Sequence, residues 1–376
     1  MVFIATGMID ATGPMVSLAK NSFHISNTLA SFLPMLGFIM FGIVAIPIGI
    51  LQDRKSKKYV LKVGLRISLV GLLIPILGGM YGKIAVNPNS LQQFYEILFA
   101  ILLLGAGAAI IHVSGNPMIR DLSDEGQFSK NLSFAQFFNT IGSSLGFLLP
   151  IIMLHAFGLD WSALFPFFAI LVLLNLILLS SVKIVEKDKT GEKLATFKSC
   201  IRLLKNSYVL MMVLGIFICC GVEISLSSHV PTLLKEKCMI PVEKTGLVII
   251  WLLFYFPILL GRLYGALIMR WISPNLLLLS STVISLLGIS LLFQNSYTLT
   301  ITGIFLAGLG LANICPLIFS VVIDRLPKHT NELSGLMISA IAGAAFVPPV
   351  MGIVADFFSI QTSILVPIIC TCYLSI

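Results

Sequence analysis

Apolar runs without a charged residue, each as long as a lipid bilayer is thick, recur along the whole chain. They include residues 29–52, 97–119, 131–159, 161–182 and 357–376. A helix needs about 20 residues to cross a bilayer, so each run is long enough to span one. The alternation of apolar and polar residues that marks a membrane barrel is absent from the sequence, so we expect a helix bundle.

Composition and motifs exclude several classes of protein. Only 11% of the 376 residues are charged, against about 25% in an ordinary soluble domain. The sequence contains no P-loop, G-x-S-x-G or H-E-x-x-H motif, so we expect neither an enzyme nor a cofactor. The seven cysteines show no paired spacing. We interpret them as small apolar packing residues, with no disulfide and no metal site.

We predict an all-α membrane protein with twelve spans. The spans are expected at residues 1–20, 28–51, 60–82, 94–118, 131–155, 161–183, 206–230, 243–268, 273–293, 298–322, 333–355 and 359–376. No basic segment or small-residue cleavage site accompanies the first span, so we expect a mature helix there instead of a signal peptide.

Basic residues predict the orientation. With twelve spans, eighteen of the 24 Lys and Arg residues fall on one side of the membrane, five fall on the other, and Arg262 lies inside a span. By the positive-inside rule, the basic side and both termini are cytoplasmic. The net charge of +8 therefore reflects this orientation and contact with anionic lipid, and it requires no nucleic-acid partner.

Two internal repeats divide the chain. GILQDR at 49–54 has a counterpart in GALIMR at 265–270, and FLLP at 147–150 has one in FVPP at 346–349. We predict two six-helix halves, 1–184 and 205–376, joined by a cytoplasmic linker, 185–204. Carriers that work by alternating access hold substrate between such repeats.

The loop GILQDRKSKK at 49–58 is the most specific short motif. It resembles the G-x-x-x-D-R-x-G-R-R signature of the major facilitator superfamily, with Ser56 in place of the second glycine. Asp53 can accept hydrogen bonds from a helix N-terminus or an arginine, so Asp53 and Arg54 are candidate gating residues. The alternative is an ordinary basic cluster beside the membrane.

Within that superfamily, the chain resembles the fucose/glucose/galactose:proton symporter family. The matching stretches are Asn116-Pro117, NLSFAQFFNTIG at 131–142, Gly221-Val222-Glu223, GRLYG at 261–265, and 328–356. The resemblance implies the major facilitator fold and proton-driven uptake of a hexose or 6-deoxyhexose through the bacterial inner membrane. Composition and spacing alone indicate only a twelve-helix carrier.

Two amides enter a run that is otherwise apolar. Gln136 and Asn139 are three residues apart and therefore share a helix face. An amide in hydrocarbon is costly without a partner, so this pair indicates a polar pathway. The candidate residues for substrate binding are His112, Asn116, Gln136, Asn139, Glu223 and Asn313.

Two of the ionisable residues inside the spans, Asp10 and Glu223, are candidates for proton coupling. Asp10 lies at the position that resembles the family's proton-binding carboxylate, and Glu223 is a second carboxylate that can bind sugar hydroxyls or carry the proton itself. The alternative for Asp10 is a structural carboxylate. Arg262 is a counter-charge for one of the two or a gating residue, unless it snorkels to the interface.

His112 is where the chain departs from the resembling family. Four residues before Asn-Pro, fucose-type members carry Glu and glucose-type members carry Gln. A histidine there either faces the central cavity near Asp10 and Gln136 or simply packs in the core. We expect a monomeric proton-coupled sugar transporter. The alternatives are a facilitator or exporter of another small polar solute and a sugar sensor that does not transport.

Overall fold

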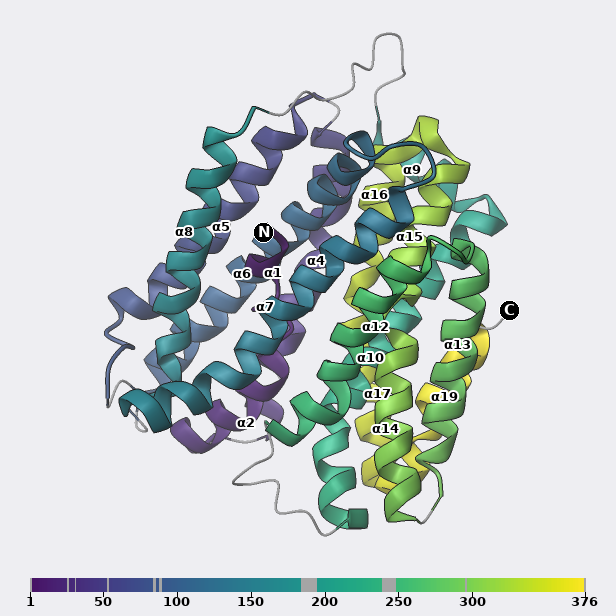
Figure 1. Cartoon of the computed structure of the whole chain (residues 1–376). Coiled ribbons are helices and arrows are strands. Elements are labelled where there is room, and N and C mark those ends of the chain that lie inside the picture. Colours follow the sequence, from purple (N-terminus) through teal and green to yellow (C-terminus); the bar gives the residue numbers. More distant parts are fainter. Residues whose placement is uncertain are drawn as a thin grey trace. The chain divides into compact units, whose positions relative to one another are not determined.

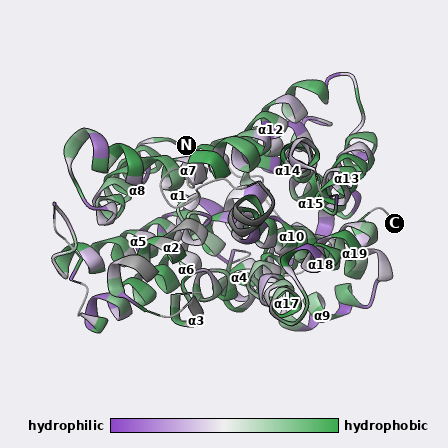
Figure 2. Cartoon of the chain, turned by 90° about the horizontal axis from the view of Figure 1, so that it is seen from below, coloured by the Kyte–Doolittle hydropathy of each residue, from purple (hydrophilic) through white to green (hydrophobic). Residues whose placement is uncertain are grey.

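The computed structural model of the protein describes residues 2–25, 27–30, 32–52, 54–83, 86–87, 90–183, 195–238, 248–294 and 296–374. These residues form helices joined by short connections and contain no strand (Figure 1). Most of the helical residues are hydrophobic, as the green colour in Figure 2 shows. Asp53, one of the predicted gating residues, lies outside the described residues.

Ten helices in the described part of the chain are long and apolar enough to cross a membrane. The pair α1 (Val2–Thr6) and α2 (Thr12–Phe23) and the shorter apolar segment Ile360–Leu374 coincide with the first and last predicted spans. The twelve spans predicted from the sequence therefore each have a helical counterpart.

The described chain forms two compact units. Unit 1 consists of Met1–Leu122, Ile141–Cys200 and Lys328–Ser339, and unit 2 consists of Ser123–Thr140, Ile201–Pro327 and Ala340–Ile376. Each unit takes most of one predicted half and one segment from the other half. The division of the chain into six-helix halves at residues 184 and 205 therefore stays a prediction from the sequence.

Unit 1 is built around the long helix α6 (Leu91–Asp121), which packs against α4 (Phe32–Leu51) and α5 (Lys57–Leu77). Its other elements are α3 (Asn27–Ala30), η1 (Trp161–Ala163), α8 (Leu164–Ser181), most of α7 (Phe128–Phe157), the start of α9 (Phe197–Leu204), the end of η3 (Pro327–His329) and α16 (Thr330–Ser339). The helices α5 and α8 run side by side (Figure 1).

In unit 2, α14 (Tyr297–Leu311), α15 (Ile314–Arg325) and α17 (Gly343–Phe357) pack against α10 (Ser207–Cys238), and α12 (Phe256–Ile268) packs against α14. Unit 2 also contains η2 (Trp251–Tyr255), α13 (Pro274–Leu291), η4 (Ala340–Ala342), α18 (Ile360–Ser363) and α19 (Leu365–Leu374). The start of α7 belongs to this unit, where Ser129 donates a hydrogen bond of 2.8 Å to Ser320 of α15.

Candidate functional site

The first span is interrupted at Asp10. Helix α1 ends at Thr6 and α2 begins at Thr12. Between them, the Asp10 N–H bonds the carbonyl of Gly7 at 3.2 Å, three residues back instead of four. Pro14 explains the interruption, because a proline in a continuous helix lacks the N–H for the carbonyl four residues earlier, here Asp10, and its ring clashes with that carbonyl.

The interruption exposes the Asp10 carboxylate to a donor from α7. The Ser143 hydroxyl donates a hydrogen bond of 2.6 Å to Asp10 Oδ2. The approach is close because Gly142 has no side chain: a Cβ atom there would lie 2.1 Å from the Ile4 carbonyl oxygen. Ser143 is not among the candidate residues predicted from the sequence. A signal for it existed, since Ser143 lies seven residues after Gln136 and therefore on the same helix face.

His112 is buried in unit 1 among aromatic rings. Its imidazole centroid lies 5.3 Å from the ring centroid of Phe3 and 6.1 Å from that of Phe41. Four residues further along α6, Asn116 is 3% exposed, and its Oδ1 has no hydrogen-bond partner among the described residues. A buried amide oxygen with no partner is costly, which makes Asn116 a candidate acceptor for a bound hydroxyl.

In unit 2, Arg262 of α12 is 7% exposed and faces Glu223 of α10. Its Nη2 lies 3.8 Å from Glu223 Oε1, so the two side chains form an ion pair. Arg262 therefore does not snorkel to the membrane interface. Within this unit it is the counter-charge of Glu223.

The same guanidinium also donates hydrogen bonds to α7 and to the tenth span. Arg262 Nη1 donates to the Thr140 hydroxyl at 2.5 Å and to the Gln136 carbonyl at 3.3 Å, and Nε donates to the Ala312 carbonyl at 3.1 Å. That carbonyl is available because Pro316, four residues later, has no N–H. The tenth span accordingly divides at Ala312-Asn313 into α14 and α15.

Asn313 occupies this second interruption. It is 3% exposed, its Nδ2 donates a hydrogen bond of 2.7 Å to the Gly261 carbonyl, and its Oδ1 has no partner among the described residues. A Cβ atom at Gly265 would lie 2.4 Å from Asn313 Nδ2, so Gly265, the second glycine of GRLYG, makes room for this side chain. Asn313 thus offers an acceptor in the same way as Asn116.

The two amides of α7 have different surroundings. Asn139 is buried, while Gln136 is half-buried and its main-chain carbonyl accepts hydrogen bonds from Arg262 and from Thr140. Both lie in unit 2, with Glu223, Arg262 and Asn313, whereas Asp10, His112 and Asn116 lie in unit 1. In unit 2, Gln136, Glu223 and Asn313 surround Arg262 and its neighbour Gly261 and form a polar cluster with them. Arg54, the other candidate gating residue, is exposed in the turn after α4.

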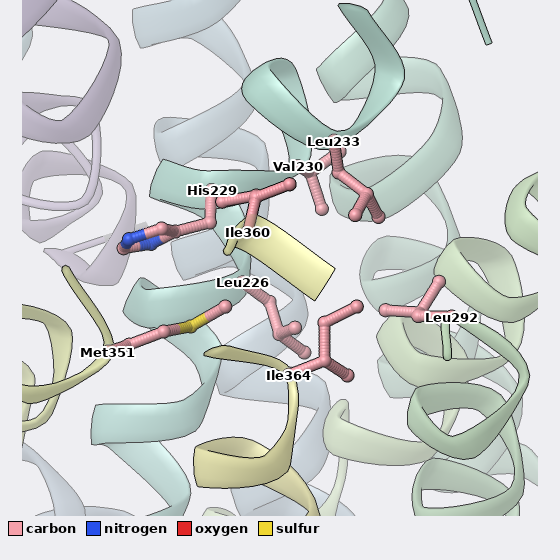
Figure 3. A pocket seen from close by; sticks show the side chains of 8 residues that line it. All are labelled: Leu226, His229, Val230, Leu233, Leu292, Met351, Ile360 and Ile364. Carbon is pink, nitrogen blue, oxygen red and sulfur yellow. The ribbon is translucent and has the colours of Figure 1, made fainter. Parts of the chain in front are cut away.

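None of these candidate residues lines the pocket found in unit 2. Its lining consists of Leu226, His229, Val230, Leu233, Leu292, Met351, Ile360 and Ile364 (Figure 3). His229 is its one polar side chain, and Nδ1 of that ring lies 2.9 Å from the Ser225 carbonyl of the same helix. This apolar lining offers a sugar too few polar partners, so the pocket is not a candidate substrate site.

Comparison with known proteins identifies the family of the chain. A sequence profile described as Major Facilitator Superfamily matches residues 1–341. The glucose/galactose transporter of Brucella abortus (strain 2308) is 23% identical over 384 residues, covering 100% of this chain and 91% of that protein. The L-fucose-proton symporter of Escherichia coli (strain K12) is 22% identical over 385 residues, covering 93% of this chain and 84% of that protein.

A solved structure shows the same fold. The crystal structure of the transporter FucP in the outward conformation matches with a TM-score of 0.79 and 19% identity, and the match covers 100% of this chain and 96% of that one. The major facilitator fold and the family resemblance predicted from the sequence motifs are therefore confirmed.

Proposed function

Because this chain belongs to the Major Facilitator Superfamily, we propose that it takes up a monosaccharide together with a proton by alternating access. The proposed substrate is a hexose or a 6-deoxyhexose. Relatives described as a glucose/galactose transporter and an L-fucose-proton symporter support this substrate class. The proposed setting is the bacterial inner membrane, with both termini in the cytoplasm and the protein acting as a monomer.

The observation that carries the coupling proposal is the Asp10 carboxylate at the interruption of the first span, hydrogen-bonded by Ser143. A carboxylate in a low dielectric is stable as an anion only where donors or charges compensate it, so its surroundings control proton uptake. Glu223, paired with Arg262, is the second proposed proton carrier. The two carboxylates have different partners, a hydroxyl and a guanidinium, and therefore suit different roles.

For the sugar, the proposed contacts are His112, Asn116, Gln136, Asn139, Glu223 and Asn313. Sugars are recognised by hydrogen bonds to their hydroxyls, and the buried Oδ1 atoms of Asn116 and Asn313 lack partners among the described residues. Each of these acceptors gains a hydrogen bond when a hydroxyl enters. Asp53, Arg54 and Arg262 are the proposed gating residues.

The test is uptake into proteoliposomes that contain the purified protein, with an imposed proton gradient. We expect at least one of labelled D-glucose, D-galactose and L-fucose to accumulate above equilibrium, and a protonophore to abolish the accumulation. Equilibration without accumulation would instead indicate a facilitator, and binding without flux would indicate a sensor. Both results contradict the proposal.

The orientation has its own test. Reporter fusions at Thr190 and Asn295, both outside the described residues, should report opposite sides of the membrane, with Thr190 in the cytoplasm. This expectation follows from the excess of Lys and Arg on one side. The same sidedness at both positions would refute it.

A further inference from the structure

Cysteine side chains gather where α10 packs against α15. The sulfur atoms of Cys220 and Cys315 lie 3.5 Å apart. Cys219, which precedes Cys220 in α10, also lies close to Cys315. The sequence predicts these cysteines only as apolar packing residues, because 95 residues separate the two members of the close pair.

This thiol pair lies beside the polar cluster of unit 2. Cys220 precedes Glu223 by three residues and therefore shares its face of α10. Cys315 is two residues beyond Asn313, in the first turn of α15. Cys220 and Cys315 are half-buried, whereas Cys219 is buried. A small polar reagent that reaches Glu223 therefore meets Cys220 and Cys315 before Cys219.

We propose that Cys220 and Cys315 are an oxidation-sensitive dithiol, and that closing it to a disulfide stops transport. With hydrogen peroxide as the two-electron oxidant, one thiol loses its proton and attacks a peroxide oxygen, which forms a sulfenic acid and releases one water. The second thiol then attacks the sulfenic sulfur and releases a second water as the disulfide forms. Diamide accomplishes the same oxidation by accepting two electrons and two protons.

The inhibition follows from what the bond would join. A disulfide requires the sulfur atoms to approach to about 2.05 Å, which ties the helix of Glu223 to the beginning of α15. Asn313, which immediately precedes α15, donates a hydrogen bond to the Gly261 carbonyl, and Arg262 donates one to the Ala312 carbonyl. The tenth span is discontinuous, with α14 ending at Leu311 and α15 beginning at Ile314, and alternating access opens and closes a site lined by such helices. A covalent link between α10 and the beginning of α15 opposes that movement.

Differential thiol labelling detects the proposed disulfide between Cys220 and Cys315. Purified protein in proteoliposomes is treated with diamide, its free thiols are blocked with N-ethylmaleimide, and the thiols that dithiothreitol then releases are labelled and located by peptide mass spectrometry. We expect label on Cys220 and Cys315 together, loss of sugar uptake, and recovery of uptake after reduction. Failure of the two cysteines to acquire label, or a bond that leaves uptake unchanged, overturns the proposal.

Serine variants identify the pair. Cys220→Ser and Cys315→Ser should each abolish the inhibition by diamide, whereas Cys219→Ser and Cys372→Ser should stay sensitive. Inhibition that persists in Cys220→Ser overturns the assignment. The uptake measurement rests on the proposed function, but the labelling does not. If the disulfide forms but the protein transports no tested sugar, the proposed function is contradicted and the dithiol assignment is not. If sugar is transported but no disulfide forms, the dithiol assignment is contradicted and the proposed function is not.

Discussion

The hydroxyl of Ser334 donates a hydrogen bond of 2.7 Å to the carbonyl oxygen of Val113. Both groups are buried in unit 1, where α16 packs against α6. The Val113 carbonyl accepts no main-chain hydrogen bond from the residue four positions later in its helix, because that residue, Pro117, has no N–H. A proline inside a membrane helix thus creates a binding point for a neighbouring helix.

The same arrangement of a proline and an outside donor occurs in unit 2. Arg262 Nε donates a hydrogen bond to the Ala312 carbonyl, which has no donor in its own helix because Pro316 has no N–H. Pro14 stands in the same relation to Asp10. In all three places the freed carbonyl belongs to a residue at or next to a candidate functional position. Breaks in the main-chain bonding of membrane helices are tolerated where other polar groups complete it.

Ser334→Ala should lower the thermal stability of the purified protein. Removing an interhelical hydrogen bond in a membrane protein costs on average about 0.6 kcal/mol. In a Pro117→Ala background the helix supplies its own donor to Val113, so Ser334→Ala should cost less there. The matched control is Ser339→Ala, since Ser339 donates to Leu336 of its own helix. Equal losses in both backgrounds would contradict the role of Pro117.

Asp10→Asn should remove sugar accumulation while leaving exchange or sugar binding measurable. The permanently neutral side chain mimics the protonated state, so the loaded carrier can still reorient. Counterflow and gradient-driven uptake, measured on the same preparation, separate the two activities. A variant that still concentrates sugar under a proton gradient excludes Asp10 as the coupling site.

Ser143→Ala should change the pH dependence of uptake, because it removes a hydrogen-bond donor to Asp10. Ser144→Ala is the matched control, since the hydroxyl of Ser144 is buried with no partner among the described residues. The control should keep the wild-type profile. Identical pH profiles for Ser143→Ala and the wild type would show that the hydrogen bond does not act on coupling.

Glu223→Ala should destabilise the protein strongly. It leaves the buried Arg262 without its counter-charge, and because Glu223 is half-buried we expect a cost at or below the roughly 3–5 kcal/mol of a fully buried pair. Exchanging both partners for apolar residues, Glu223→Leu with Arg262→Met, should restore much of the thermal stability but no transport. A double variant as unstable as Glu223→Ala would show that the other contacts of Arg262 outweigh its pairing with Glu223.

Gln136→Ala and Asn139→Ala should each weaken sugar binding by roughly 1–3 kcal/mol, the cost of leaving a buried polar group unpaired. Asn175→Ala is the control, because the amide of Asn175 donates to Leu171 of its own helix. Isothermal titration of purified variants measures the effect. Loss of thermal stability with wild-type affinity would show that the two amides only join helices.

His112→Gln should keep the fold, shift the pH profile of transport and move preference toward glucose-like sugars. Neutral imidazole, like an amide, can both donate and accept a hydrogen bond, but only imidazole gains a charge on protonation near neutral pH. Competition among D-glucose, D-galactose and L-fucose measures the preference. If substrate ranking and pH dependence both stay as in the wild type, His112 is only a packing partner of Phe3 and Phe41.

The sequence by itself determined the helical membrane fold and the approximate position of each span. Apolar length and charge are properties of neighbouring residues, and a membrane permits few other structures for such runs. Pro14 and Pro316 also mark the two helix interruptions locally, and Pro117 marks a missing main-chain hydrogen bond within α6, because each proline removes a hydrogen bond to the residue four positions earlier.

Only the tertiary structure decided which residues meet across helices. Ser143 with Asp10, Arg262 with Glu223, and Cys220 with Cys315 are separated by 133, 39 and 95 residues. Whether such side chains meet depends on the rotation and depth of two helices. Those are set by packing of small residues such as Gly142 and Gly265 against neighbouring backbone and side chains, which no local pattern encodes.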